Sequence, residues 1–542
     1  MALVRTVIVF RFVRALAVLT LLLTAGAGVT AAEATPRAHG PGDSSLELYT
    51  PLLPEFRERA IAQSAGQLSR YDVSAVFSPA TNEDARLTGT LNLKFVNQTG
   101  HEQPSVYFRL YPNSAEYGSG HLEITAAQVA GTPVPITLDN DETVATLPLP
   151  TPLADGDAID IYLQFTTIIP TNPTRTYGMF GYDRVNGTYA LAHWLPLLAG
   201  FDREIGWNLQ PVSIQGDPVF TNTALFDVRL TVPSDLVVVA TGEELSARKT
   251  LPGMMQRHFV SGPVRDFVLV IDDDFQSDSL PVGGTTVRSW FNPGSASGGM
   301  NVMLWGAQSL AVFNRLFGPY PYTELDLVQV DLGNGAAGVE FPQILFIGGD
   351  HYAADAYTRR IPDFLEFVVA HEVAHQWWYG LVGNNQYLHA FLDEGLTNYV
   401  ATVYFEEEYG ADRYAYQVNL NLKLPYLAML FAGEGDAIVD QPTDSFPSQN
   451  VYGTMVYAKA ALGFAAIRSA IGDPAFFSGL KAYADAFAFS FAIATPDDLR
   501  QALEQASGQN LAELWSHWFD SAAGLQDFSP DDLTQLRRDL GD

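Results

Sequence analysis

The stretch VVAHEVAHQWWYG, residues 368–380, carries two histidines four residues apart, with a glutamate directly after the first. In a helix, positions i and i+4 lie on one face, so the imidazoles of His371 and His375 can reach a single metal ion. Imidazole nitrogens are good ligands for zinc, and two of them supply half of a tetrahedral shell. Glu372 lies one step round the helix, beside the position where water would approach the metal, which suits a general base.

A third ligand is expected from the next helical segment. Eighteen residues separate His375 from Glu394, which opens the helical pattern EGLTNYVATVYFEEEYG behind Asp393, a candidate N-cap. Two antiparallel helices joined by a loop can bring Glu394 against the histidine pair. His389, in the connecting loop, is the competing third ligand, although we interpret it as a surface histidine. Two histidines and one glutamate with an open fourth position predict a catalytic site for one zinc ion.

The metal site must be held by a large scaffold, and the chain supplies one. Its 542 residues are 47% hydrophobic and 12% aromatic, which is typical of a globular protein with two or three domains. From residue 71 to about residue 272, short runs such as RLTGTLNLKFVN and DLVVVATG alternate apolar and polar side chains between turn residues. This pattern predicts an antiparallel β-sandwich or a saddle-like sheet.

After about residue 290 the apolar residues recur at helical spacing instead. A strand is expected at 325–332, and helices are expected at 300–318, 362–379, 393–409, 452–471, 474–487, 496–507 and 510–520. The fold class is therefore multidomain α+β, with an N-terminal β domain at 71–265 and a mostly helical catalytic domain at 266–524. Residues 525–542 are expected to form a short charged tail.

The first residues have the pattern of an export signal. Arg5, Arg11 and Arg14 precede an uncharged stretch at 15–32, and small residues near its end suit a cleavage site. The alternative is an uncleaved membrane anchor, because eighteen uncharged residues are near the lower limit for a span. We expect cleavage, and therefore a secreted, periplasmic or cell-surface protein without a membrane segment. Residues 33–70 then form a flexible lead-in that includes a short helix over 54–70.

Charge and cysteine content exclude several other classes. The chain has 61 acidic and 30 basic residues, so its net charge is −31, and it shows no basic cluster outside the N-terminus. A nucleic-acid partner is therefore not expected. The absence of cysteine excludes disulfides, thiolate metal ligands and a cysteine nucleophile.

The motif AHEVAHQWWYG…LDEGLTNY resembles the gluzincin family of zinc aminopeptidases that includes alanyl aminopeptidase and leukotriene hydrolase. The likeness covers roughly residues 71–524, and FGPYPY at 317–322 and WLP at 194–196 also resemble segments of that family. The resemblance implies a thermolysin-like catalytic domain behind the β domain. It also implies a short form without the family's large helical C-terminal domain, and hence a more open cleft.

The same resemblance implies a substrate site. Family members hold the free α-amine of the substrate with the glutamate of a Gly-x-Met-Glu-Asn loop, and in AAGVEFP that position is Glu340, with Gly338 also assigned to substrate binding. A carboxylate at a fixed distance from the metal recognises a protonated amine through charge-assisted hydrogen bonds. Ala337, Val339 and Phe341 replace the usual Gly, Met and Asn, so the fine specificity stays open.

A tyrosine two residues before a lysine stabilises the tetrahedral oxyanion in the family. In VYGTMVYAKAALGF the resemblance places this role on Tyr457, before Lys459, with Tyr452 as the second choice. Oxyanion donors of this kind contribute about 3–4 kcal/mol to catalysis.

Together these residues predict an exported zinc aminopeptidase that acts on peptides with a free N-terminus. A zinc endopeptidase or an epoxide hydrolase on the same site is the alternative with the same metal. A non-catalytic binding or scaffold protein is the alternative from another class, but it predicts missing ligands, and none is missing here. The preferred N-terminal residue and the oligomeric state are not predicted.

Overall fold

The computed structural model describes residues 44–541 except 82, 172–178, 218, 334–335 and 353–362. The expected export signal at 1–32 and the first part of the lead-in lie outside the described residues. Residues Ser45–Asp542 form one compact unit, so the domain boundary expected at 265–266 stays a prediction. Within the described ranges, no helix has the length and the apolar character that a membrane span requires.

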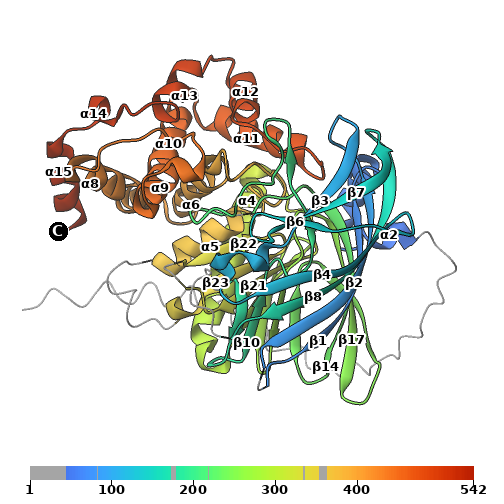
Figure 1. Ribbon diagram of the computed structural model, residues 1–542. Coiled ribbons are helices and arrows are strands. Elements are labelled where there is room, and N and C mark those ends of the chain that lie inside the picture. Colours follow the sequence, from blue (N-terminus) through green and yellow to red (C-terminus); the bar gives the residue numbers. More distant parts are fainter. Residues whose placement is uncertain are drawn as a thin grey trace, which may run out of the picture. The chain divides into compact units, whose positions relative to one another are not determined.

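The first half of the described chain forms the β-rich part that the alternating pattern predicts (Figure 1). Its largest sheet has eight strands in the order β16-β17-β14-β1-β2-β8-β4-β5. In β2 every second side chain from Ala85 to Phe95 is buried, which is the pattern of a strand with one face on the core. The strands are β1 (Arg70–Ser78), β2 (Ala85–Val96), β4 (His121–Val129), β5 (Thr132–Pro133), β8 (Ala158–Ile169), β14 (Ala224–Pro233), β16 (Glu243–Lys249) and β17 (Met254–Val264).

One pairing in this sheet departs from the antiparallel expectation. Strands β1 and β14 are parallel, with Arg70 opposite Leu225, whereas the other pairs are antiparallel. Parallel neighbours need a long connection, and here the chain builds several other strands before it returns. Those other strands are β3 (Gln103–Arg109), β6 (Thr137–Asp139), β7 (Val144–Leu153), β9 (Phe180–Asp183), β10 (Thr188–Leu191), β11 (Leu197–Leu198), β12 (Phe201–Asp202) and β13 (Gly206–Trp207), with β15 (Val237–Ala240) and β18 (Leu269–Asp272) following later.

The described part of the lead-in is not flexible, in contrast to the expectation. Helix α2 (Ser44–Glu47) is followed by Tyr49 and Leu52, which are 2% and 0% exposed. Leu52 forms a β-bridge with Tyr322, so this segment is fixed to the second half of the chain. The expected short helix is present as α3 (Pro54–Ser64).

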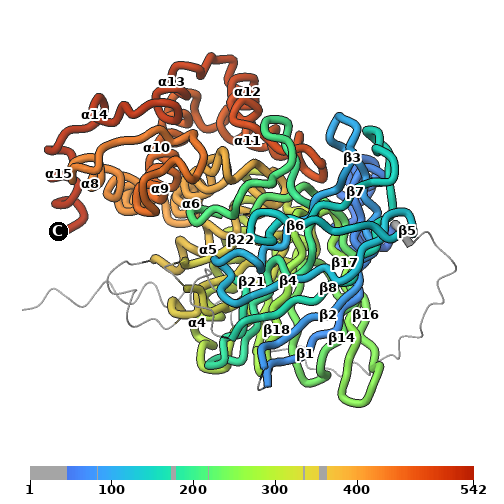
Figure 2. The backbone as a smooth tube through the Cα atoms, in the orientation of Figure 1, coloured from blue at the N-terminus to red at the C-terminus, as the bar shows by residue number. Residues whose placement is uncertain are grey.

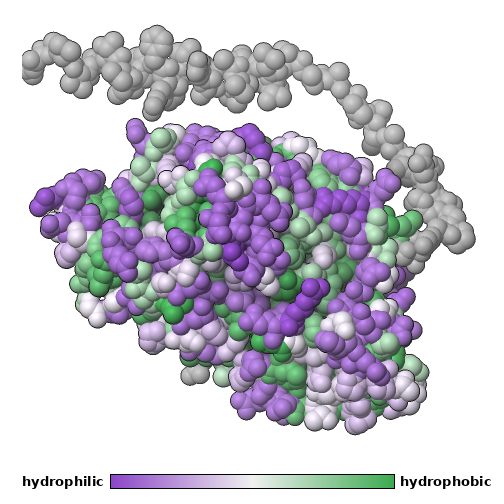
Figure 3. Space-filling model, turned by 90° about the horizontal axis from the view of Figure 1, so that it is seen from above, coloured by the Kyte–Doolittle hydropathy of each residue, from purple (hydrophilic) through white to green (hydrophobic). Residues whose placement is uncertain are grey.

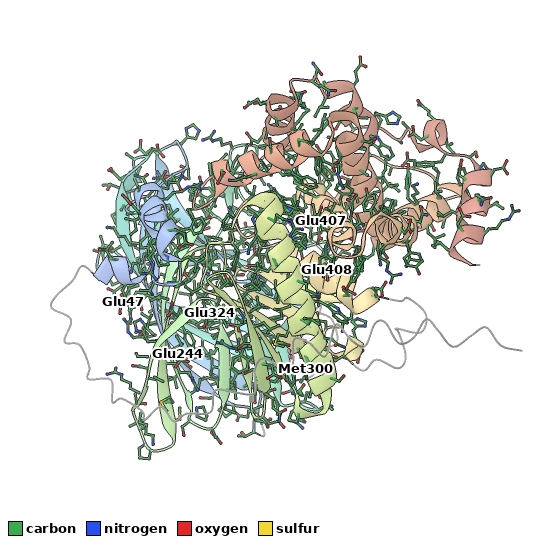
Figure 4. All side chains as sticks on the ribbon, turned by 180° about the vertical axis from the view of Figure 1, so that it is seen from behind. Glu47, Glu244, Met300, Glu324, Glu407 and Glu408 are labelled. Atoms are coloured by element: carbon green, nitrogen blue, oxygen red, sulfur yellow. The ribbon has the colours of Figure 1, made fainter. Side chains whose placement is uncertain are left out.

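A mixed five-stranded sheet begins the second half, in the order β19-β20-β21-β23-β22. Strand β22 lies at the edge of this sheet and pairs only with β23 among the described strands. Helix α4 packs against the sheet and against the next helices, and Figure 4 shows Glu407 and Glu408 beside it, where Arg315 contacts Glu407 at 2.6 Å. The elements are β19 (Gln276–Val282), β20 (Thr285–Phe291), α4 (Ala296–Phe317), β21 (Glu324–Val330), β22 (Gly338–Phe341) and β23 (Ile344–Gly348).

Helices make up the rest of the described chain, as Figure 2 shows for its orange and red segments. They are α5 (Phe364–Ala374), α6 (Glu394–Tyr409), α7 (Ala411–Gln417), α8 (Leu424–Ala432), α9 (Gln449–Gly453), α10 (Ala460–Ile471), α11 (Asp473–Phe487), α12 (Pro496–Ser507), α13 (Ala512–Trp518), α14 (Gly524–Asp527) and α15 (Pro530–Leu540). Two π-helical turns, Val418–Lys423 and Thr454–Lys459, join neighbouring α-helices.

Three expectations for these helices need correction. Helix α5 ends at Ala374 rather than at residue 379, because the chain turns around Trp378 to form a β-bridge with Val382. Helices α7 and α8 were not expected. The expected charged tail contains helix α15, which has a capping box at its N-terminus and buries Leu536 on one face. A charged sequence can form a stable helix when one apolar stripe is covered.

The architecture confirms the predicted fold class, a β-rich N-terminal part followed by a mostly helical part. The hydrophobic core runs through both halves. Hydrophilic side chains dominate the face seen in Figure 3, in keeping with the net charge of −31.

Candidate metal centre

Helices α5 and α6 bring the three expected metal ligands together. His371 lies in the last turn of α5, and His375, directly after it, keeps a helical backbone conformation, so both rings leave the same face. Glu394 opens α6, where the side chain of Asp393 accepts a hydrogen bond from the Glu394 N–H at 2.9 Å. His371, His375 and Glu394 are 9%, 0% and 4% exposed.

The three ligand atoms have the spacing of a tetrahedral zinc site. Nε2 of His371 lies 3.1 Å from Nε2 of His375 and 3.1 Å from Oε2 of Glu394. Nε2 of His375 lies 3.3 Å from the same Glu394 oxygen, which completes a triangle. Zinc ligands lie about 2.0–2.1 Å from the metal, which at tetrahedral angles places neighbouring ligand atoms roughly 3.3 Å apart. The donor set and its triangle therefore fit zinc, and one corner of the tetrahedron has no ligand among the described residues.

Neighbouring groups orient each ligand, as in known zinc sites. Nδ1 of His375 lies 2.9 Å from the carbonyl oxygen of Trp378, so the ring donates there and directs its other nitrogen to the metal position. The hydroxyl of Tyr457 donates to Oε1 of Glu394. The Tyr457 ring also stacks on the ring of His371, with centroids 6.0 Å apart.

The electrostatics of the triad favour a charged carboxylate beside the rings. Burial alone would raise the pKa of Glu394, but the hydrogen bonds and charges of His371 and His375 outweigh it, so the pKa falls far below its ordinary value. Burial lowers the pKa of His371, which favours the neutral imidazole that a metal requires.

Glu372 is buried beside the triad without a partner for one of its oxygens. Glu372 is only 5% exposed, and its Oε2 atom has no hydrogen-bond partner within the described structure. Burial raises the pKa of Glu372 to about 8. A methyl group on Gly338 of β22 would lie 2.2 Å from Oε1 of Glu372, so only glycine lets the edge strand approach this closely. Such a carboxyl group is suited to accept and return a proton.

Glu340 extends the cluster of acids away from the metal ligands. It lies on β22, is 6% exposed, and has a carboxylate oxygen within 4.8 Å of ligand atoms of both Glu372 and His375. Burial, together with the charge of Asp217, raises the pKa of Glu340. Gly338 and Glu340, both on β22, thus line the cleft.

Asp217 is a cleft residue that the sequence did not reveal. Its carboxylate lies within 4.8 Å of oxygens of Glu340 and Glu394, although it belongs to a loop of the β-rich half. Burial and the nearby charge of Glu394 raise its pKa. Asp217 is one of 61 acidic residues, and no spacing connects it with the histidine motif. The local sequence Gly-Asp-Pro at 216–218, a composition typical of turns, was the one signal near it.

Hydrogen bonds connect the loop that carries Asp217 to the helical half of the chain. Ser213 Oγ donates to Oδ1 of Asp444 at 2.8 Å, and Gln215 Nε2 donates to the carbonyl oxygen of Phe446 at 3.1 Å. Gly216 has φ +68°, and a methyl group there would lie 2.4 Å from the hydroxyl oxygen of Tyr452. The loop therefore needs glycine at this point, both for its left-handed conformation and for space.

His389, the competing third ligand, and Tyr452, the competing oxyanion donor, lie in different environments. His389 is not the surface histidine that the sequence suggested, because its side chain is only 15% exposed. Its two ring nitrogens contact Asp440 at 2.6 Å and Glu204 at 3.1 Å. It is not among the clustered ligand atoms. Tyr452 lines the cleft next to Tyr457, and the hydroxyl of Tyr457 donates to Glu394.

Tyr457 lies in the π-helical turn Thr454–Lys459. Such a turn inserts one extra residue into a helix and is frequent at functional sites. Lys459, at its end, is 1% exposed and donates to the carbonyl oxygens of Ala437 and Ser521 at 2.7 and 2.6 Å. Lys459 thus connects the end of this turn to two segments distant in the sequence.

The cleft is an acidic cavity of about 410 Å³. It is lined by four carboxylates, those of Asp217, Glu340, Glu372 and Glu394, and its described lining contains no lysine or arginine. The cavity can therefore hold a divalent cation and, next to it, a second positively charged group.

Residues 305–518 match the peptidase family M1 domain. This match covers less than half of the chain, and over that segment the chain is similar to peptidase family M1. It is 26% identical over 309 residues to Aminopeptidase M1-A of rice, Oryza sativa subsp. japonica, an alignment that covers 54% of this chain and 34% of the relative. With the Puromycin-sensitive aminopeptidase of Caenorhabditis elegans the identity is 25% over 322 residues, which is 56% of this chain and 32% of the relative. The chain thus spans about a third of the length of these relatives.

Solved M1 structures share the fold. An M1 zinc metallopeptidase from Deinococcus radiodurans superposes with a TM-score of 0.58 at 19% identity, over 84% of this chain and 93% of that chain. A mutant of that enzyme bound to a Tyr-Ser-Ala substrate gives the same TM-score at 19% identity, over 83% and 93% of the two chains. The solved neighbours are named as zinc metallopeptidases, and the donor set His371, His375 and Glu394 of this chain fits the same metal.

Proposed function

We propose that this chain is an exported zinc aminopeptidase that removes the N-terminal residue from peptides. The observation that carries the proposal is the pair of carboxylates, the buried Glu340 and the partly buried Asp217, beside the zinc-type triad in a cavity whose described lining contains no lysine or arginine. Two acids held close together away from bulk water need a positive partner, because unpaired charge is costly in a protein interior. The ammonium group of a peptide N-terminus provides that partner.

His371, His375 and Glu394 are the residues that hold one zinc ion. Zinc in such a site polarises the substrate carbonyl and lowers the pKa of water to about 7. Glu372 accepts the proton of the attacking water at its free oxygen and then passes it to the leaving amine. Its buried position keeps the transfer away from bulk solvent.

Tyr457 stabilises the developing negative charge on the substrate oxygen. Its hydroxyl already contacts Glu394 of the triad. Rotation of the hydroxyl proton directs the same donor towards a substrate oxygen that lies beside the metal position. Oxyanion donors of this type contribute about 3–4 kcal/mol. Tyr452 is the alternative donor.

Glu340 and Asp217 select substrates with a free α-amine and fix its distance from the metal position. Peptides blocked by acetylation lose the charge that the two carboxylates recognise. Strand β22 is at the edge of its sheet among the described strands, and an extended peptide can add to that edge through backbone hydrogen bonds. Export is supported by the pattern of residues 1–32, and peptides are the partners that this chemistry recognises.

The test compares alanyl p-nitroanilide with its N-acetyl form, on protein with zinc, after chelator treatment and after zinc is restored. We expect hydrolysis of the free-amine substrate only, loss with the chelator and recovery with zinc. Asp217→Asn and Glu340→Gln should each lower kcat/KM by about 10-fold or more without loss of zinc. Asp160→Asn, at an exposed position on β8 outside the cavity, is the matched control.

The same assay separates the other functions. Equal hydrolysis of acetylated peptides would indicate an endopeptidase. Turnover of an epoxide without turnover of any peptide would indicate an epoxide hydrolase. Stoichiometric zinc with no hydrolysis of either class would indicate a binding protein.

A further inference from the structure

Gln376 directly follows His375 in the histidine motif, and neither metal binding nor proton transfer uses its side chain. The residue is 2% exposed, so the carboxamide lies in the protein interior. A buried carboxamide needs partners for both its oxygen and its nitrogen, because an unpaired polar group is costly there. Two of its three partners come from the hairpin of β22 and β23, which carries Glu340.

The carboxamide of Gln376 contacts the turn of this hairpin with both of its polar atoms. Its Nε2 donates to the carbonyl oxygen of Phe341 at 3.0 Å, and its Oε1 accepts from the N–H of Gln343 at 2.8 Å. A carbonyl oxygen only accepts and a backbone N–H only donates, so these partners determine the orientation of the amide. The hydroxyl of Tyr320 donates to the same Oε1 at 3.1 Å. All three partners are uncharged groups.

The turn is held from a second side as well. Strands β22 and β23 are joined by Pro342 and Gln343. Gln343 has φ +68°, a conformation that glycine or asparagine adopts more readily than glutamine. Its Nε2 donates to the carbonyl oxygen of Ser261 on β17 at 2.7 Å. Hydrogen bonds from Gln376 and from the β-rich half therefore stabilise a turn that is unfavourable by itself.

The contact between Gln376 and the hairpin lies one residue from a functional group at each end. Phe341 directly follows Glu340, the proposed amine-binding residue, and Gln376 directly follows a candidate metal ligand. Phe341 is 3% exposed, and its ring packs against Phe346 with centroids 5.0 Å apart. The residue after Glu340 is therefore fixed at its side chain by packing and at its carbonyl oxygen by Gln376.

From these contacts we propose that Gln376 is a positioning residue, which holds Glu340 at a fixed distance from the metal ligands. The proposal rests on the proposed aminopeptidase function, because Glu340 must bind the α-amine while the first carbonyl of the same substrate lies at the metal position. One Cα atom separates that amine from that carbonyl, so the substrate has little freedom to accommodate a shift of about 1 Å. An amide performs this role without adding a charge beside a cavity that already contains four carboxylates.

The binding test compares two zinc-binding ligands that differ in the amine. Acetohydroxamate binds zinc alone, whereas alanine hydroxamate also presents an α-ammonium group. Calorimetric titration of the zinc-loaded protein should give a Kd for alanine hydroxamate about 10- to 100-fold below that for acetohydroxamate, the effect of charge-assisted hydrogen bonds. In Gln376→Met, which keeps the length of the side chain without the amide, the ratio of the two Kd values should fall to within about 3-fold. Zinc content and the Kd of acetohydroxamate should stay unchanged.

A double-mutant cycle identifies the group through which Gln376 acts. Gln376→Met should lower kcat/KM on alanyl p-nitroanilide by about 10-fold, close to the loss expected for Glu340→Gln, because both substitutions disable the same amine site. In the Glu340→Gln background, Gln376→Met should lower kcat/KM by less than about 3-fold. Losses that multiply in the double variant would overturn a role through Glu340.

Gln329→Met is the matched control. Gln329 is a buried glutamine on β21 outside the cavity lining, and its amide also has two partners, the N–H of Asn292 at 3.1 Å and the hydroxyl of Ser295 at 3.0 Å. This variant loses comparable hydrogen bonds but should keep the wild-type ratio of Kd values. Tyr320→Phe is a milder second variant, because it removes one of the three hydrogen bonds of Gln376, and it should lower the ratio by about 3-fold.

The outcomes separate the positioning role from the proposed function. A wild-type ratio of Kd values in folded Gln376→Met, or in Tyr320→Phe where Gln376→Met does not fold, would overturn the positioning role and leave the aminopeptidase function standing. An equal fall of the ratio in Gln329→Met would do the same, because it would show a general effect of lost stability. Equal Kd values for the two hydroxamates in the wild-type protein would contradict the amine site itself, and with it the proposed function.

Discussion

Gly338 is the position where a single methyl group should disable the general base and spare the metal site. A Cβ atom there would lie 2.2, 2.4 and 2.5 Å from Oε1, Cδ and Cγ of Glu372. Non-bonded carbon atoms prefer separations of about 3.5–4.0 Å, so the Glu372 side chain must move by at least about 1 Å. Gly338 is not among the glycines with positive φ, and alanine therefore adopts its backbone conformation without strain.

The expected effect of Gly338→Ala follows from that displacement. A misplacement of about 1 Å can lower a catalytic rate by about 100-fold, which corresponds to roughly 2.7 kcal/mol in the activation free energy. His371, His375 and Glu394 are not among the atoms that the new methyl group meets, so the protein should still contain one zinc ion per chain.

The assay compares kcat/KM on alanyl p-nitroanilide with zinc content by mass spectrometry and with Tm. Gly294→Ala is the control, because a Cβ atom at this position has no heavy atom within 4 Å. Wild-type kcat/KM in a folded Gly338→Ala protein would refute the reasoning, since Glu372 would then not act from the position that the structure gives it.

Three further predictions concern single groups. Glu372→Gln should lower kcat by about 1,000-fold or more while zinc stays bound, and unchanged turnover would exclude this residue as the base. Tyr457→Phe should lower kcat by about 100-fold with little change in KM, whereas Tyr452→Phe should have the smaller effect; the reverse order would move the oxyanion role to the second tyrosine. Burial raises the pKa of Asp326 to about 7, so the folded chain keeps a proton that the unfolded chain releases near pH 4. Its contribution to the free energy of unfolding is complete below about pH 4 and is lost as the pH rises through 7, and Asp326→Asn should flatten the Tm–pH profile in that window. An identical profile for the variant would contradict the shift.

The acidic lining has a consequence for metal content as well as for substrate choice. Four carboxylates share one cavity, and repulsion between them is relieved when a divalent cation and an ammonium group are both present. The cleft is thus arranged for two positive charges in fixed positions, which is the electrostatic reason why an exopeptidase fits it better than an endopeptidase.

Local patterns in the sequence led to the three candidate metal ligands that the structure brings together. The positions of His371 and His375 follow from helical periodicity, and Glu394 follows from the start of the next helix, because each depends on residues only a few positions away. Alternation predicted the strands of the β-rich half for the same reason. Local patterns failed where a distant contact decides, as in the parallel pairing of β1 with β14 and in the burial of Tyr49 and the lead-in.

Only the tertiary structure decided how the cleft is completed. Asp217 reaches it from a loop of the β-rich half, and no periodicity relates that loop to the histidine motif 154 residues later. Tyr457 contacts Glu394 across 63 residues of sequence, and the pairing of His389 with Glu204 and Asp440 depends on segments far apart in the chain. Spacing along the chain determines which side chains share a helix face, whereas packing between elements determines which side chains meet across a cavity.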